Sequence, residues 1–149
     1  MMKVAILMGS EKDMGKMEPA AAVLHDFGIE HEVHVMSAHR TPHKVSDFAA
    51  TARDNGFGVI ICGAGKAAHL AGAVAAHSTL PVIGIPVSAG GLGGVDALYS
   101  TVQMPTGIPV ATVAIDSSAN AAYLAAAILS VSDAELARKL DEYREELAQ

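Results

Sequence analysis

Residues 37–42 read Ser37-Ala38-His39-Arg40-Thr41-Pro42. They follow a short apolar segment, His31 to Met36, and precede an amphipathic one, so we expect a turn between a strand and a helix. Pro42 suits the first helical turn, where a missing N–H costs nothing, and Thr41 can cap the helix just before it. The pattern therefore predicts a rigid turn around the two side chains in front of Thr41.

Those two side chains are chemically distinct. His39 can exchange protons near neutral pH, and Arg40 can hold a phosphate or carboxylate through two parallel hydrogen bonds. A proton-transfer group beside an anion-binding group indicates a reaction centre. The alternative is a solvated loop with two ordinary polar residues, because loops are polar for many reasons.

The composition fits one domain, residues 1–149, with 51% hydrophobic residues and no Trp. A small chain with surplus apolar surface often buries it against copies of itself, so we expect a homo-oligomer. The net charge of −6 and the lack of a basic stripe argue against a nucleic-acid partner. The single Cys62 fits a reducing interior, and no segment reads as a signal peptide or membrane span, so the expected location is cytoplasmic.

Apolar segments alternate with helical patterns along the whole chain. The expected strands are Lys3–Met8, His31–Met36, Val59–Cys62, Pro81–Val87 and Val110–Ile115. The expected helices run from Ser10 to Phe27, from Pro42 to about Ala52, from Ala67 to Ala76, from near Val95, from Ala119 to Ser130, and from a capping box at Ser132–Glu135. This alternation predicts an α/β fold with a parallel sheet covered on both faces.

Right-handed crossovers place every strand-to-helix loop at one edge of such a sheet. These loops are Gly9–Asp13, Ser37–Thr41, Gly63–Lys66 and Ser88–Gly94. The return loops at the opposite edge carry little beyond turn residues. Because open α/β sheets bind ligands outside the carboxyl ends of their strands, the polar and glycine-rich loops lie where a ligand is expected. This asymmetry favours the functional interpretation of His39 and Arg40.

Three further features have both a functional and a structural interpretation. Ser10 and Asp13, at a helix N-terminus, can bind an anion and ribose hydroxyls, or they can simply cap the helix. Gly63-Ala64-Gly65-Lys66-Ala67-Ala68 matches the loose dinucleotide pattern Gly-x-Gly-x-x-Ala, which is a weak signal this far from the first strand. His69, expected just inside the next helix, is at a position that is more often structural than catalytic. No cluster of histidines predicts a metal site.

With these residues in view, the chain closely resembles the N5-carboxyaminoimidazole ribonucleotide mutase and aminoimidazole ribonucleotide carboxylase family of purine biosynthesis. Four motifs carry the resemblance over nearly the whole chain: Met8-Gly9-Ser10-x-x-Asp13, the 37–42 turn, Gly63-Ala64-Gly65-x-Ala67-Ala68-His69-Leu70, and the run from Gly94 to Pro105. The resemblance implies a flavodoxin-like three-layer αβα sandwich with a five-stranded parallel sheet. It also implies a homo-octamer and no metal or organic cofactor.

The resemblance implies roles for nine residues. His39 is the expected proton shuttle, and the expected substrate-binding residues are Ser10, Asp13, Ser37, Arg40, Gly65, Lys66, His69 and Leu70. In the mutase, the N5 carboxylate leaves as carbon dioxide inside a closed pocket and reacts again at C4, with His39 serving both steps. The glycine-rich loop 88–94 is a candidate gate.

Two departures from the family pattern bear on the branch. Lys66 stands where the mutase usually has Gly, and Ala71 where it usually has Pro; a cation at the Lys66 position is typical of the carboxylase, which uses carbon dioxide directly. Arg40 and His69 follow the mutase, which we therefore favour. The alternatives are the carboxylase, a related carboxylating enzyme acting on another nucleotide, and a non-catalytic nucleotide-binding module of the same shape.

Overall fold

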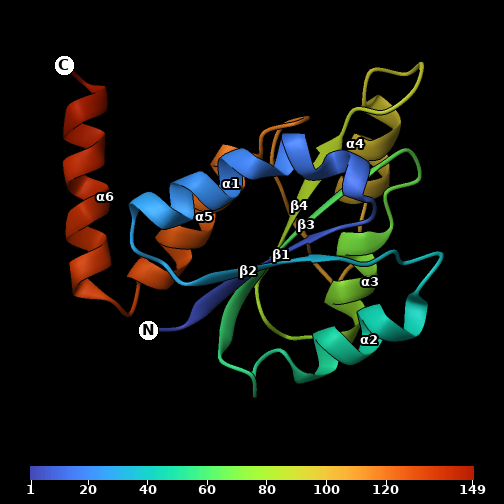
Figure 1. Ribbon diagram of the computed structural model, residues 1–149, viewed down its shortest axis with the longest axis horizontal. Coiled ribbons are helices and arrows are strands. Elements are labelled where there is room, and N and C mark those ends of the chain that lie inside the picture. The colour runs from blue at the N-terminus through green and yellow to red at the C-terminus, as the bar shows by residue number, and fades with distance from the viewer.

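The computed structural model describes residues 1–149 as a five-stranded, all-parallel sheet flanked by helices (Figure 1). The strand order is β2-β1-β3-β4-β5, so the chain starts near the middle and winds outward in both directions. The strands are β1 (Lys3–Met8), β2 (His31–Val35), β3 (Phe57–Gly65), β4 (Val82–Val87) and β5 (Ala111–Thr112). The predicted fold class is confirmed, and all strand-to-helix turns meet at one edge of the sheet.

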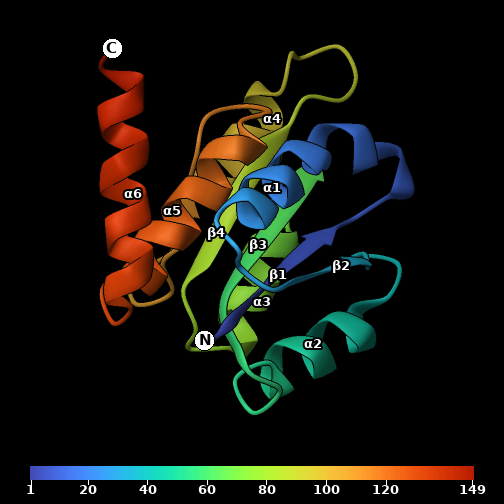
Figure 2. The ribbon, with the colours of Figure 1, turned by 60° about the vertical axis from the view of Figure 1, so that its left-hand side comes forward.

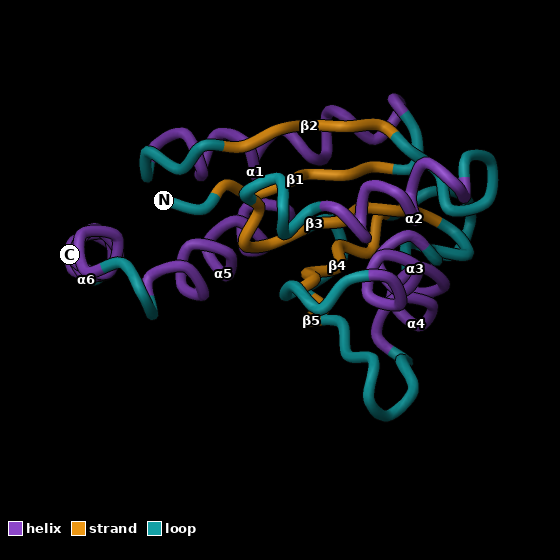
Figure 3. The backbone as a smooth tube through the Cα atoms, turned by 90° about the horizontal axis from the view of Figure 1, so that it is seen from below, coloured by secondary structure: helices purple, strands orange, loops and turns teal.

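Helices cover both faces of the sheet (Figure 3). A single 3₁₀ turn, η1 (Glu11–Asp13), precedes α1 (Met14–Asp26), which lies beside α5 (Ser118–Ser130) on one face. The other face carries α2 (Pro42–Thr51), α3 (Leu70–His77) and α4 (Val95–Val102). The last helix, α6 (Ala134–Leu147), packs against α5 outside the sandwich (Figure 2).

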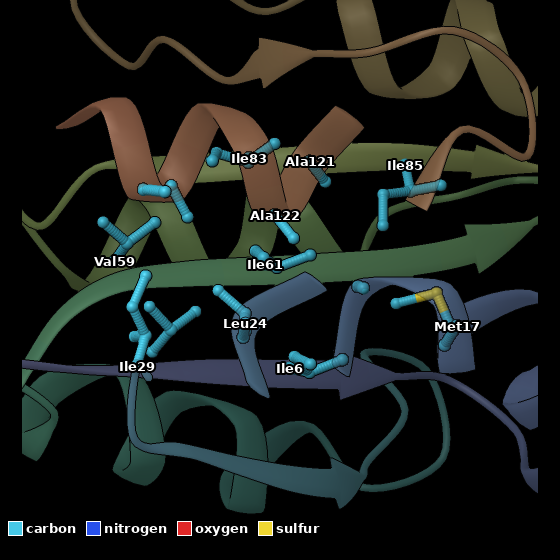
Figure 4. Packing of buried hydrophobic residues seen from close by; sticks show 14 of the residues in the cluster. Ile6, Met17, Leu24, Ile29, Val59, Ile61, Ile83, Ile85, Ala121 and Ala122 are labelled. Carbon is cyan, nitrogen blue, oxygen red and sulfur yellow. The ribbon is translucent and has the colours of Figure 1, made fainter. Parts of the chain in front are cut away.

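The alternation of side chains along the strands divides the interior into two apolar layers. Ile6, Ile61 and Ile83 point to the α1/α5 face, where Leu24 and Ala122 meet them (Figure 4). The residues in between, among them Leu7, Ile60 and Cys62, point to the α2/α3 face. Buried on both faces, the three central strands read as continuous apolar runs, as expected for a parallel sheet.

The third strand is longer than the sequence predicted. Gly63, Ala64 and Gly65 belong to β3 and pair with β4, so the first turn residue is Lys66. A Cβ on Gly63 would lie 2.4 Å from the sulfur of Met17, and one on Gly65 would lie 2.9 Å from Cβ of Ala89. Close approach of α1 and of the loop after β4 therefore favours glycine at these two positions, and the expected loop at 63–65 was wrong.

Two helix caps also differ from expectation. Thr41 makes no capping hydrogen bond to α2, because its hydroxyl bonds back to Ser37. The last helix is capped by Asp133, whose Oδ1 accepts the amide of Leu136 at 3.0 Å, so the capping box at Ser132–Glu135 was wrong by one residue. In α2 the Thr41 hydroxyl closes the preceding turn instead of capping the helix, and in α6 Asp133 replaces Ser132 as the cap.

The last strand of the structure is also shorter than the sequence predicted. It was expected over Val110–Ile115, and only Ala111 and Thr112 pair regularly with β4. Beyond them the amides of Val113 and Asp116 still donate to Gly84 O at 3.1 Å and Pro86 O at 2.8 Å, so the segment follows the edge of the sheet irregularly. None of the helices is both long and apolar enough to cross a membrane.

Candidate functional site

A cavity of about 410 Å³ lies at the carboxyl edge of the sheet. The turns after β1, β2 and β3 form its walls, together with Ala89 and Gly90 of the glycine-rich loop. All nine residues singled out from the sequence line it: Ser10, Asp13, Ser37, His39, Arg40, Gly65, Lys66, His69 and Leu70. They come from three separate segments of the chain, so the fold brings the three motifs to one place.

The 37–41 turn is closed by its own side chains. The hydroxyl of Ser37 accepts the amides of His39 at 3.3 Å and Arg40 at 3.1 Å. The hydroxyl of Thr41 accepts the amide of Ser37 at 2.9 Å and donates to its carbonyl at 3.1 Å. Ser37 therefore fixes the backbone of the two functional residues, and its own hydroxyl hydrogen stays available to a ligand.

His39 and His69 form a close pair. Their Nε2 and Nδ1 atoms are 2.5 Å apart, and the rings meet edge to face with centroids 4.7 Å apart. Two ring nitrogens at this distance share one proton, since two N–H groups would repel each other. His69 lies at the N-cap of α3, just before the helix rather than inside it as predicted, and this position turns its side chain toward His39.

Ser10 and Asp13 line the cavity from the turn after β1. The Ser10 hydroxyl accepts the amide of Lys12 at 3.3 Å, which caps the η1 turn as expected. Burial raises the pKa of the Asp13 carboxyl; Lys16 lowers it and Asp116 raises it further. Half-buried and facing the cavity, this carboxylate can accept hydrogen bonds from a ligand.

Lys66 holds an unusual backbone conformation. Its φ is +55°, a left-handed value that costs a residue with a Cβ about 1–2 kcal/mol. A Cβ on Gly90 would lie 3.6 Å from Cε of Lys66, so the lysine stem crosses toward the glycine-rich loop. Strain of this kind is typical of functional sites, where the surrounding structure holds it in place.

One charged residue of the cavity, Lys12, was not predicted from the sequence. Its place between Ser10 and Asp13, in the first turn after β1, was the available signal. With Arg40 and Lys66 it makes the cavity cationic. No group of three or more His, Cys, Asp or Glu side chains is arranged to hold a metal ion, and Cys62 is buried away from the site.

These features define a parallel α/β protein with a cationic ligand cavity and a histidine pair at the carboxyl edge of its sheet. The family model described as AIR carboxylase matches residues 3–149. The chain belongs to the AIR carboxylase family, as its motifs indicated.

Named relatives match over almost the whole chain. N5-carboxyaminoimidazole ribonucleotide mutase of Thermotoga maritima is 51% identical over 147 residues, covering 99% of this chain and 86% of the relative. The Escherichia coli K12 mutase is 52% identical over 144 residues, covering 95% of this chain and 85% of the relative. Phosphoribosylaminoimidazole carboxylase of Saccharomyces cerevisiae is 53% identical over 140 residues, 94% of this chain but 24% of the yeast protein. A crystal structure of PurE from Treponema denticola superposes with a TM-score of 0.89 at 37% identity, covering 98% of this chain and 91% of the other.

Proposed function

We propose that this chain is an N5-carboxyaminoimidazole ribonucleotide mutase of purine biosynthesis. It moves the carboxylate from N5 to C4 of the imidazole, giving 4-carboxy-5-aminoimidazole ribonucleotide. The observation that carries the proposal is His39 paired with His69 at 2.5 Å in the cationic cavity. Similarity to curated mutases over almost the whole chain supports it.

His39 is proposed as the proton shuttle. When the N–C bond of the carbamate breaks, carbon dioxide leaves and N5 takes a proton from His39. C4 then attacks the trapped carbon dioxide, and the C4 proton returns to His39, so the ring ends the cycle as it began it. The proton shared with His69 holds the ring in one orientation during both transfers.

The neighbouring residues bind and enclose the ribonucleotide. Arg40 and the hydroxyls of Ser10 and Ser37 are suited to an anionic phosphate, and the Asp13 carboxylate to ribose hydroxyls. Gly65, Lys66 and Leu70 complete the lining of the cavity. Loop 88–94 closes over the pocket and keeps carbon dioxide from escaping. The reaction as written consumes no cofactor.

Isotope labelling tests the proposal. Unlabelled N5-carboxyaminoimidazole ribonucleotide is supplied together with labelled bicarbonate, and label in the product is followed over early turnovers. We expect little incorporation, because the transferred carboxylate comes from the substrate. We also expect little activity when aminoimidazole ribonucleotide and modest bicarbonate are the only substrates.

The second candidate is an aminoimidazole ribonucleotide carboxylase, and Lys66 favours it. Its cation lies in the cavity where a carboxylate could form and would stabilise the developing charge. The same labelling experiment separates the two functions. Efficient carboxylation of the free ribonucleotide, with failure to use the carboxylated one, would place the chain in the carboxylase branch.

A further inference from the structure

The two ends of the glycine-rich loop 88–94 touch each other. A Cβ on Gly94 would lie 3.2 Å from Cα of Ser88 and 2.6 Å from Cγ2 of Ile115. We call the contact between Ser88 and Gly94 the neck of the loop. Beyond the neck the loop stands out from the molecule, at the end of the sheet where β4 leads into α4 (Figures 1 and 2). Because the neck is this narrow, whatever holds Ser88 controls the position of the residues that follow it.

Ser88 is held by two charged side chains from distant parts of the chain. Its amide donates to Oδ1 of Asp116 at 2.8 Å, and its hydroxyl donates to Oδ2 at 2.5 Å. Its carbonyl and its hydroxyl oxygen each accept from Nζ of Lys16 at 2.6 Å. Nζ of Lys16 and Oδ2 of Asp116 are themselves 3.5 Å apart. Every polar group of Ser88 is therefore engaged by this pair.

The two charged residues are themselves fixed in place. The hydroxyl of Ser118, which is 1% exposed, donates to the carbonyl of Lys16 at 2.6 Å. The amide of Asp116 donates to Pro86 O at 2.8 Å, and its φ of +59° is a strained value for a residue with a side chain. The segment around Asp116 thus holds both the backbone and the side chain of Lys16, and the strain at Asp116 is maintained by these contacts.

We propose that Lys16 and Asp116 are positioning residues of this site: they clamp Ser88 and so hold Ala89 and Gly90 against the bound ribonucleotide. Ala89 and Gly90 line the cavity, and neither Lys16 nor Asp116 does. The clamp rests on the function proposed above, because it acts on the loop that closes that pocket. Without it the neck loosens and the wall at Ala89 and Gly90 becomes mobile.

The experiment compares Lys16→Met and Asp116→Asn with the unchanged protein by amide hydrogen exchange and steady-state kinetics. We expect faster exchange at 89–94 in both variants, with exchange elsewhere unchanged. Lys16→Met should lower kcat/KM about tenfold while Tm stays the same, and Lys16→Arg, which keeps the charge and the donors, should restore most of it. Lys44→Met removes an exposed lysine outside the clamp and should behave as the unchanged protein.

Unchanged exchange at 89–94 in Lys16→Met, or unchanged kcat/KM, would overturn the clamp. The exchange measurement needs no turnover. If the unchanged protein proves inactive as a mutase, the proposed function fails, and faster exchange still tests whether Lys16 and Asp116 hold the loop.

Discussion

At the scale of single residues, turnover is expected to depend on the imidazole of His39. We predict that His39→Asn abolishes catalysis, because an amide cannot exchange the proton. Ribonucleotide affinity should stay within about tenfold, roughly 1.4 kcal/mol, since Asn keeps the backbone of the 37–41 turn. Turnover assays and calorimetry on the same preparation measure the two effects, and near-normal turnover would rule out the shuttle.

Arg40 is expected to act through binding. It is exposed in the cavity, and its amide is tied to Ser37, so the guanidinium projects from a fixed backbone. A hydrogen bond to a charged group contributes about 1.5–3 kcal/mol. Arg40→Ala should therefore raise the dissociation constant of the ribonucleotide at least about tenfold, measured by calorimetry. Unchanged binding would mean that its side chain does not reach the ligand.

Two substitutions of Lys66 separate the effect of its backbone strain from the effect of its charge. Lys66→Gly removes both, so the free energy of unfolding should be unchanged or rise by up to about 1 kcal/mol, as relief of the φ of +55° exceeds the entropy cost of Gly. Lys66→Ala removes only the charge and keeps the strain. If the chain is a mutase, both variants should lose less than about tenfold in kcat/KM. A much larger loss in both would make the cation essential, as in a carboxylase.

The residues of the site were largely predictable from the sequence, and their contacts were not. Turn chemistry and the asymmetry of the loops are local features of the chain, and they are enough to indicate Ser37, His39 and Arg40. The Lys16–Asp116 contact joins residues 100 positions apart in the chain, and no local pattern signals such a pair. Geometry of this kind depends on how α1 and the segment after β5 meet, which only the packed fold defines.

At the scale of secondary-structure elements, Gly84 of β4 is a place where helix α4 approaches the sheet closely. A Cβ there would lie 2.4 Å from Cγ2 of Thr101, 3.0 Å from Cγ1 of Val110 and 3.3 Å from Cβ of Ala71. These atoms belong to short, branched or backbone-proximal groups on three sides, so they cannot swing away. Gly84→Ala should lower the free energy of unfolding by about 1–3 kcal/mol, measured by urea titration.

Gly15 provides the matched control. It lies in the first turn of α1, and a Cβ there meets nothing within 4 Å. Gly15→Ala should leave the free energy of unfolding unchanged or raise it by up to about 1 kcal/mol, because Ala has the higher helix propensity. Equal destabilisation by the two substitutions would contradict the role assigned to close packing at Gly84.

The elements also show why sequence patterns mislead at particular places. Glycines usually weaken strands, so Gly63 and Gly65 were expected in a loop. In the structure β3 continues through them because they pair with β4, and Met17 and Ala89 occupy the space that a side chain would need. Likewise His69 was expected inside a helix that begins one residue later. The apolar strands and helix faces were predictable because their period is local, whereas these boundaries depend on partners from elsewhere in the chain.

At the scale of the whole molecule, one face of α4 lacks a partner. Val95, Tyr99 and Val102 lie at helical spacing and are 42%, 64% and 43% exposed, and Leu92 beside them is 66% exposed. A single exposed apolar residue needs no explanation, but a stripe on one helix face indicates a binding surface. The apolar surplus of the composition supports association of identical chains.

We therefore predict a homo-oligomer larger than a dimer, with the α4 face among its contacts. Sedimentation equilibrium at micromolar concentration should give a mass of more than two chains. Tyr99→Asp places a charge at the centre of the stripe and should shift the distribution to smaller species. Val131→Asp is the control, because Val131 is 89% exposed in the turn between α5 and α6, away from this face. A monomer in the unchanged protein would refute the prediction, and an equal shift in both variants would remove α4 from the interface.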